Sequence, residues 1–414
     1  MFDHLLSDGA KAFREEVRDL VKWVPRQMIL DMDQDRIQFP KSFLQEAGRR
    51  NLLGCRYPVQ WGGRDMDWVA TAMAMEEVGT IGYMFACLFG VGSELVCDAI
   101  IRHGSDDQRE RYVKPLLKGE RFAAECLTEP RGGSDFFGTT TTAVEDGDHF
   151  VINGQKRFIV GADGADFFLV YAKTAVEAKA HEALTCFIVD RGPGVETQYL
   201  YGLMGCRGGG AGRIVFKNVR VPKTNVVGTV NGAYRVFNTM MIPERLGTAA
   251  MTIGAARPAL EVATAYSSRR KAFGATINTF QGVSFQVADA VMLLDASRAM
   301  VYATCTAVDA GQPQGTIRRM VSQTKKFVTE SCQRVAHHAM QVMGGIGYTT
   351  VFPVERIVRD LRLASIWTGT NEVMSMIIAN EWYRAHAAKK AGVDPRNWEL
   401  DAAQADATDE KIFE

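Results

Sequence analysis

The feature that most constrains the fold of this chain is a change of sequence texture that occurs twice. In the first 121 residues apolar side chains recur at helical spacing, as in the stripe that begins at Phe13 and stops before Pro25. Residues 122–230 then consist of short runs rich in β-branched and aromatic residues, separated by turn sequences such as EDGD, NGQ and RGPG. Helical spacing returns near residue 238 and continues almost to the end of the chain.

Helices, then strands, then helices is the order expected of an α+β protein with a β segment between two helical parts. We therefore predict an N-terminal helical domain over residues 1–121 and a central antiparallel β-barrel or sheet domain over 122–237. A C-terminal helical domain is predicted over 238–390. Residues 391–414 are acidic and poor in large apolar side chains, and we expect them to form a mobile tail.

Composition and charge exclude several classes of protein. The 48 basic and 48 acidic residues of the chain balance, so no overall field favours nucleic acid. The eight cysteines include no CxxC pair, which is typical of reduced thiols in a cytoplasmic protein. Acidic residues near the N-terminus argue against a signal or transit peptide, and the longest uncharged run, the 16 residues 78–93, is too short for a membrane span. His337 and His338 are adjacent and lack a third ligand at metal spacing, so no metal is expected.

Four stretches share their residue types and order with one known family. They are LTEPRGGSD (127–135), RKAFG followed by FQ (270–274 and 280–281), QVMGGIGY (341–348) and WTGTNEVMSMIIA (367–379). Together they resemble the acyl-CoA dehydrogenase family, flavoproteins that desaturate acyl-CoA thioesters between Cα and Cβ. The resemblance covers roughly Lys11 to Arg384, and it implies that the C-terminal helices form a four-helix bundle.

The resemblance also implies an FAD site. The Gly-, Ser- and Thr-rich loop at 127–135 has the backbone freedom and hydroxyls to meet such a ligand, although an ordinary turn has the same composition. A guanidinium at Arg270 could clamp a pyrophosphate, and the alternative is a solvated helix end. The residues implied to bind FAD are Leu127, Thr128, Phe158, Val160, Arg270, Phe273, Gln281, Gln341, Gly344, Gly345, Thr370 and Glu372. The family shares this site between neighbouring subunits, which implies at least a homodimer and usually a homotetramer.

The catalytic base is predicted from two positions, one where the expected glutamate is missing and one where a glutamate is present. Family chemistry requires a carboxylate in a dry pocket to remove the α-proton. Many members carry it in a YEGT motif, but here Thr368 stands at that position and cannot act as the base. A subset that includes isovaleryl- and long-chain-type enzymes carries the base in an ERL motif instead, and Glu244 lies in such a motif, 26 residues before Arg270. A lone glutamate near a helix start is more often a surface residue, but the coincidence favours Glu244.

The resemblance further implies contacts to the substrate. Its CoA and acyl parts are expected to meet Ser134, Tyr234, Arg245, Thr368 and Gly369. A backbone N–H at position 368 survives the change of side chain and could still polarise the thioester carbonyl. The segment 83–91 corresponds to the wall of the acyl pocket, where its aromatic residues would suit a branched, cyclic or aryl group; core packing is at least as good an explanation. Arg131 or Arg207 would be needed for a dicarboxylic acyl group, and solvated surface is the more common role.

Two departures keep other functions open. Phe158 and Val160 stand where the family usually has a tryptophan that packs on the flavin and a threonine that bonds to its N5. The main prediction is an FAD-dependent acyl-CoA dehydrogenase that passes electrons to an electron-transfer flavoprotein. The alternatives are a desulfinase or an oxidase or monooxygenase of the same fold, and a degenerate acyl-CoA-binding scaffold.

Overall fold

The first helical part is built by eight α-helices and two π-helical segments that pack around a common core. The computed structural model describes residues 2–390. The predicted stripe of α1 is confirmed, since Phe13, Val17 and Leu20 are buried and the helix ends before Pro25. The elements are α1 (Asp8–Trp23), α2 (Arg26–Asp33), α3 (Lys41–Arg49), α4 (Trp68–Gly79), α5 (Tyr83–Gly90), η3 (Val91–Val96), α6 (Cys97–His103), α7 (Asp106–Gln108), η4 (Arg109–Val113) and α8 (Lys114–Leu117). α5, η3 and α6 run on without interruption, so 21 residues form one central helix.

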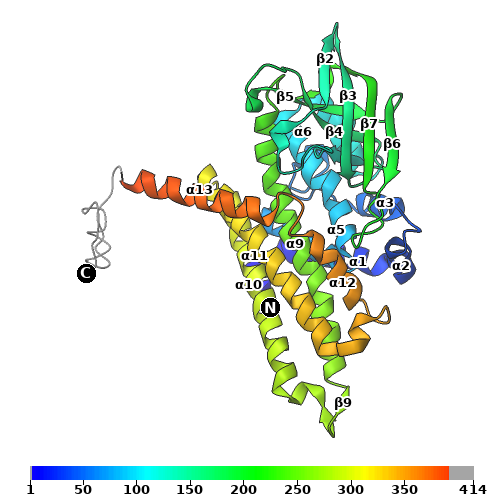
Figure 1. The fold of residues 1–414 in the computed structure, drawn as a ribbon, viewed down its shortest axis with the longest axis vertical. Helices are drawn as coiled ribbons and strands as arrows, with labels where there is room; N and C mark the ends of the chain where they lie inside the picture. Colours follow the sequence, from blue (N-terminus) through cyan, green and yellow to red (C-terminus); the bar gives the residue numbers. More distant parts are fainter. Residues whose placement is uncertain (1, 391–414) are drawn as a thin grey trace.

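The central part is an eight-stranded sheet that lies at one end of the molecule (Figure 1). Its strands are β1 (Ala123–Cys126), β2 (Thr142–Asp146), β3 (His149–Ile159), β4 (Phe167–Lys173), β5 (Leu184–Asp190), β6 (Val195–Leu200), β7 (Gly212–Pro222) and β8 (Val226–Val227). Most neighbours pair antiparallel, as predicted, but β4 pairs parallel with β1 and at one position with β2. The long loop and hairpin between β1 and β4 provide the crossover that a parallel pair needs.

β4 separates two hydrophobic cores because successive strand residues point to opposite faces. Phe167, Leu169 and Tyr171 belong to the large core that the sheet shares with the helices. The residues between them, Phe168 and Val170, belong to a smaller core inside the β part. The helical face of this sheet is therefore the surface against which the C-terminal helices pack.

The C-terminal part contains four long helices and one short one. They are α9 (Ala233–Ser267), α10 (Gln281–Asp309), α11 (Gln314–Met343), α12 (Val354–Leu363) and α13 (Asn371–Lys390). α9 begins at Ala233, ahead of the predicted start at 238, because no turn or breaker interrupts the chain between Gly232 and that point. A small hairpin of β9 (Lys271–Ala272) and β10 (Ala275–Thr276) lies at the end of the molecule opposite the sheet (Figure 1). The predicted tail 391–414 lies outside the described residues.

Two helices of the described chain are long and apolar enough to cross a membrane. In the first, Tyr83–His103, 83% of the apolar window is buried inside the protein, which is the position of a core helix. In the second, Gln281–Asp309, 39% of the window is buried. Length and composition alone make this weak evidence for a span, since core helices pass the same test.

Candidate active site

Glu244 lies well inside α9, away from the first turn where it would complement the helix dipole. Its side chain is half-buried, and its Oε2 is buried without a hydrogen-bond partner among the described residues. Pro243, directly before it, has no N–H, so this turn of α9 already lacks one helical hydrogen bond. A buried carboxylate oxygen without a partner is costly, so the arrangement suits a group that awaits a ligand.

Charged and polar side chains from α5, α11 and β4, together with the adjacent Arg245, act on this carboxylate. Burial raises the pKa of Glu244 to about 7, although the cations of Arg245 and Lys325 lower it. Burial is the main cause of the raised pKa of Cys87 on α5, and the charge of Glu244 adds to it. Burial also raises the pKa of Tyr171 on β4, again with a contribution from Glu244. A carboxyl with a pKa near 7 is suited to general base chemistry at neutral pH.

The loop between α12 and α13 closes the site on another side. Lys325 on α11 donates hydrogen bonds of 2.9 Å to the carbonyl oxygen of Gly369 and 2.9 Å to Oδ1 of Asn371. Thr368 and Gly369 both have positive φ, 56° and 81°, and such a backbone is rare for a β-branched residue. The N–H of Thr368 has no acceptor among the described residues, so the fixed loop presents a free donor. Sequence analysis missed Lys325, whose only signal is a cation among the buried positions of the amphipathic helix α11.

Arg245 and Trp367 line the same loop. The ring of Trp367 packs 5.6 Å from that of Tyr83 on α5, and a methyl group added at Gly369 would contact Arg245. Arg245 is only 7% exposed, yet its Nε has no partner, and Trp367 Nε1 and Thr368 Oγ1 are buried and unpaired as well. Unpaired polar atoms on Glu244 and on this loop therefore gather in one region.

A buried ion pair fixes the loop that follows β1. The Lys156 ammonium lies 2.8 Å from Glu129 Oε1, and both side chains are at most 2% exposed. Glu129 also accepts hydrogen bonds from the N–H groups of Thr140 and Thr141. Burial alone would raise the pKa of Glu129, but Lys156 and the Thr140 and Thr141 donors together lower it to about 2. The pair was not predicted from the sequence, although it joins the TEP and NGxK segments.

Four of the predicted cofactor residues meet beside this ion pair. The Arg157 N–H donates to the Thr128 carbonyl oxygen at 2.9 Å, which places Leu127 and Thr128 next to Phe158 and Val160. Phe158 has a positive φ of 59° and is 50% exposed, so its ring stands outside the core. Val160 packs on the helical core. Thr370, also predicted to bind the cofactor, directly precedes α13, and the predicted Glu372 lies in the first turn of that helix.

The remaining predicted cofactor residues form a second group at the other end of α9. Arg270, Gly344 and Gly345 line an open groove of about 560 Å³, which Tyr266 and Ile346 also border. Phe273, Gln281 and Gln341 are exposed nearby, and Phe273 at the tip of the β9–β10 hairpin is 96% exposed. From Glu244 to the end of α9 at Ser267 is about 35 Å at a rise of about 1.5 Å per residue. One chain therefore does not bring the two groups together (Figure 1).

Two of the predicted substrate residues, Ser134 and Tyr234, lie near the surface and apart from Glu244. Tyr234 and Ser134 are exposed, and the Tyr234 ring lies 5.9 Å from that of Phe137 on the 127–137 loop. Arg131 forms an ion pair of 2.5 Å with Asp135, and Arg207 donates to the carbonyl oxygens of Leu203 and Asp33. Neither arginine is left free to bind a second substrate carboxylate.

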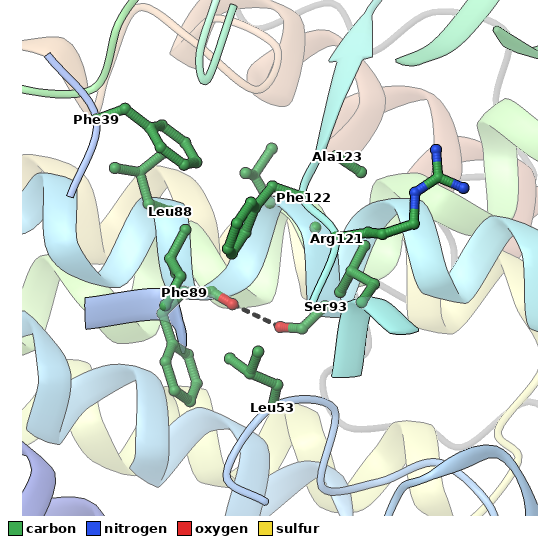
Figure 2. A pocket seen from close by; sticks show the side chains of 12 residues that line it. Phe39, Leu53, Leu88, Phe89, Ser93, Arg121, Phe122 and Ala123 are labelled. Atoms are coloured by element: carbon green, nitrogen blue, oxygen red, sulfur yellow. Dashed lines mark hydrogen bonds between the residues drawn. The ribbon is translucent and has the colours of Figure 1, made fainter. Parts of the chain in front are cut away.

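A small cavity next to the start of β1 belongs to the core. It measures about 20 Å³ and is bordered by Leu53, Phe89 and Phe122 (Figure 2). The Ser93 hydroxyl beside it already donates to the Phe89 carbonyl oxygen at 2.5 Å. Phe85 packs edge-on against Phe43 at 5.1 Å. The aromatic residues of α5, including Tyr83, thus belong to the core.

Similarity to known proteins identifies the class to which this arrangement belongs. Models of the N-terminal, middle and C-terminal domains of acyl-CoA dehydrogenases match residues 7–120, 124–219 and 231–382. A 3-(aryl)acrylate reductase of Clostridium sporogenes is 33% identical over 83% of this chain and 90% of its own length. The caffeyl-CoA reductase-Etf complex subunit CarC of Acetobacterium woodii is 32% identical over 90% of this chain and 98% of its own.

A solved structure agrees with these matches. Butyryl-CoA dehydrogenase from Megasphaera elsdenii superposes with a TM-score of 0.88 and 29% identity over 92% of this chain and 99% of its own. The matches to all three domains and to this structure place the chain among the flavin-dependent oxidoreductases. The chain belongs to the acyl-CoA dehydrogenase family, whose cofactor is FAD.

The residues present fit that cofactor. The backbone of Arg270 is hydrogen-bonded to Tyr266 and Ile277, but its side chain has no hydrogen-bond or ion-pair partner among residues 2–390. Arg270 lines the groove beside Gly344 and Gly345. Gly344 has a φ of 65°, and a Cβ at either glycine would meet nothing within 4 Å, so the backbone faces open space. Among the described residues no group of three or more His, Cys, Asp or Glu could hold a metal ion.

Proposed function

We propose that this enzyme desaturates an acyl-CoA thioester between Cα and Cβ, with Glu244 as the base that removes the α-proton. The observation that carries the proposal is the buried, unpaired Oε2 of Glu244. Lys325, whose charge acts on Glu244, also holds the loop that presents the free N–H of Thr368. The Glu244 carboxyl and the Thr368 N–H supply what the reaction needs from the protein, a proton acceptor and a donor to the thioester carbonyl.

Each nearby residue then has a defined task. Glu244 Oε2 receives the α-proton, and the Thr368 N–H stabilises the negative charge that develops on the thioester oxygen. Lys325 holds the Gly369 carbonyl and so keeps the 368 N–H in place. Bound FAD supplies the acceptor for the hydride that leaves Cβ. Leu127, Thr128, Phe158 and Val160 would hold the flavin end, while Arg270, Phe273, Gln281, Gln341, Gly344 and Gly345 of a second copy would hold the rest.

The proposal is tested by anaerobic titration of the FAD-loaded enzyme with a panel of acyl-CoAs. The panel contains straight, branched, cyclic, aryl and dicarboxylic thioesters. We expect at least one class to bleach the oxidised-flavin absorbance at about one equivalent, because proton and hydride removal would then be complete within one site. A flavoprotein that binds esters but is bleached by none of them would overturn the proposal. Reduced flavin that consumes oxygen rapidly would favour the oxidase or monooxygenase alternative, which Val160 leaves open.

The activity should depend on the protonation of Glu244. Below a pKa of about 7 this carboxyl is protonated and cannot accept the α-proton, so we expect kcat/KM to fall up to tenfold per pH unit below that value and to level off above it. The groups facing Glu244 are Glu125, Cys87, Tyr171, Arg245 and Lys325. Binding of an enoyl-CoA product needs no base and serves as the control between pH 5.5 and 8.5. A kcat/KM that is flat over this range would contradict the assignment.

Two partners complete the proposal. Exposed apolar side chains gather on the hairpin, α10 and α13, among them Phe273, Phe285, Met292, Trp382 and Tyr383. Together with the split cofactor groups, they support a homotetramer in which neighbouring copies complete each FAD site. We further propose a cytoplasmic enzyme that passes electrons to an electron-transfer flavoprotein; one relative is itself named as a subunit of an Etf complex.

A further inference from the structure

A second carboxyl group faces Glu244 from the β part. Along β1, Ala124 and Cys126 point into the core inside the β part, whereas Ala123 points into the core shared with the helices. Because strand residues alternate, Glu125 lies on the same face as Ala123 and points toward the helices. Sequence analysis overlooked Glu125, although a charged residue in the apolar strand AAEC was a visible signal.

The pairing of the strands places Glu125 in the region of the base. Its partner on β4 is Leu169, which shares a face with Tyr171. The Tyr171 hydroxyl lies 3.5 Å from the sulfur of Met240 on α9, and Glu244 follows Met240 by one helical turn on the same side. Burial and the Glu244 charge raise the pKa of Glu125 well above its ordinary value.

The Glu125 side chain has no hydrogen-bond or ion-pair partner among the described residues. Its Oε1 is buried and unpaired, and none of the ion pairs of the described residues includes it. Lys156, the cation that acts on it, is committed to Glu129 at 2.8 Å. The charge that acts on Glu125 most strongly is that of Glu244, whose own Oε2 is buried and unpaired. A polar residue with these properties is expected to meet a polar part of the ligand.

We propose that Glu125 determines the acyl specificity, by exchanging hydrogen bonds with a hydroxyl group on the acyl part of the thioester. This inference rests on the proposed function and names its substrate class. In its protonated form a carboxyl offers one donor and one acceptor, and an alcohol or phenol hydroxyl offers the same pair. A purely apolar acyl group would leave Glu125 unsatisfied, and a terminal carboxylate would lie against a second acid.

The test compares thioesters that differ by one hydroxyl group. The probes are 3-phenylpropanoyl-CoA and 3-(4-hydroxyphenyl)propanoyl-CoA, with butanoyl-CoA and 4-hydroxybutanoyl-CoA as a second pair. For each, the FAD-loaded wild type, Glu125→Leu and Glu125→Gln are examined for the dissociation constant and for anaerobic flavin bleaching. In at least one pair we expect the wild type to prefer the hydroxylated ester by roughly tenfold or more. Glu125→Leu should lose or reverse this preference, and Glu125→Gln, which keeps a donor and an acceptor, should retain part of it.

A control variant and the combination of outcomes distinguish failure of this inference from failure of the proposed function. Glu120→Gln changes an exposed acid five residues away and should leave the preference unchanged. If esters bleach the flavin but wild type and Glu125→Leu show the same hydroxyl preference, the inference fails and the dehydrogenase function stands. If no ester bleaches the flavin while the binding preference depends on Glu125, the function fails and the inference stands. Absence of a hydroxyl preference in the wild type for both pairs overturns the inference.

Discussion

Replacing Glu244 by glutamine is expected to lower turnover by roughly 10²–10⁴ while FAD content and ester affinity change little. The amide has the shape of the carboxyl but cannot accept the α-proton at neutral pH. Because the loss falls on the chemical step, kcat and kcat/KM should fall together, with KM nearly constant. Stopped-flow measurement of flavin bleaching in the variant checks this directly.

A matched control lies on the same helix. Glu261 of α9 carries an exposed carboxyl that only approaches Arg257, at 3.7 Å. Glu261→Gln should therefore leave the bleaching rate within about twofold of wild type. Near-normal bleaching by Glu244→Gln would remove Glu244 as the base. It would direct attention to Glu125, the other carboxyl at the site.

The second large effect is expected on stability. Lys156→Met should lower the free energy of unfolding by about 3–5 kcal/mol, because it leaves the buried Glu129 carboxylate without its counter-ion. It should also loosen the 127–135 loop, since Lys156 contacts the Leu127 carbonyl oxygen at 3.3 Å. Urea denaturation followed by circular dichroism gives the stability, and FAD retention on a desalting column reports on the loop.

The comparison variant removes a lysine from an exposed pair. Lys217 lies 2.8 Å from Glu196, but both side chains are about half exposed. Lys217→Met should therefore cost no more than about 0.5 kcal/mol. Equal losses of unfolding free energy in the two variants would show that burial does not increase the contribution of the Lys156–Glu129 pair to stability.

The sequence by itself determined the order of the elements and the identity of the family. Helical spacing and turn residues are local signals, so α1 before Pro25 and the β-rich segment could be predicted from neighbouring residues alone. The motifs also named Glu244, because a threonine at 368 and a glutamate at 244 are both visible in one dimension. These local patterns do not show which of these side chains lie close together in the folded protein.

Only the tertiary structure decided which charges share a space. Glu125 and Glu244 are 119 positions apart, and they face one another because strand pairing with β4 fixes one and packing of α9 on Tyr171 fixes the other. The same holds for Lys325 and the Gly369 carbonyl, and for the parallel pairing of β1 with β4. These contacts depend on burial and register between distant segments, whose energies no local pattern records.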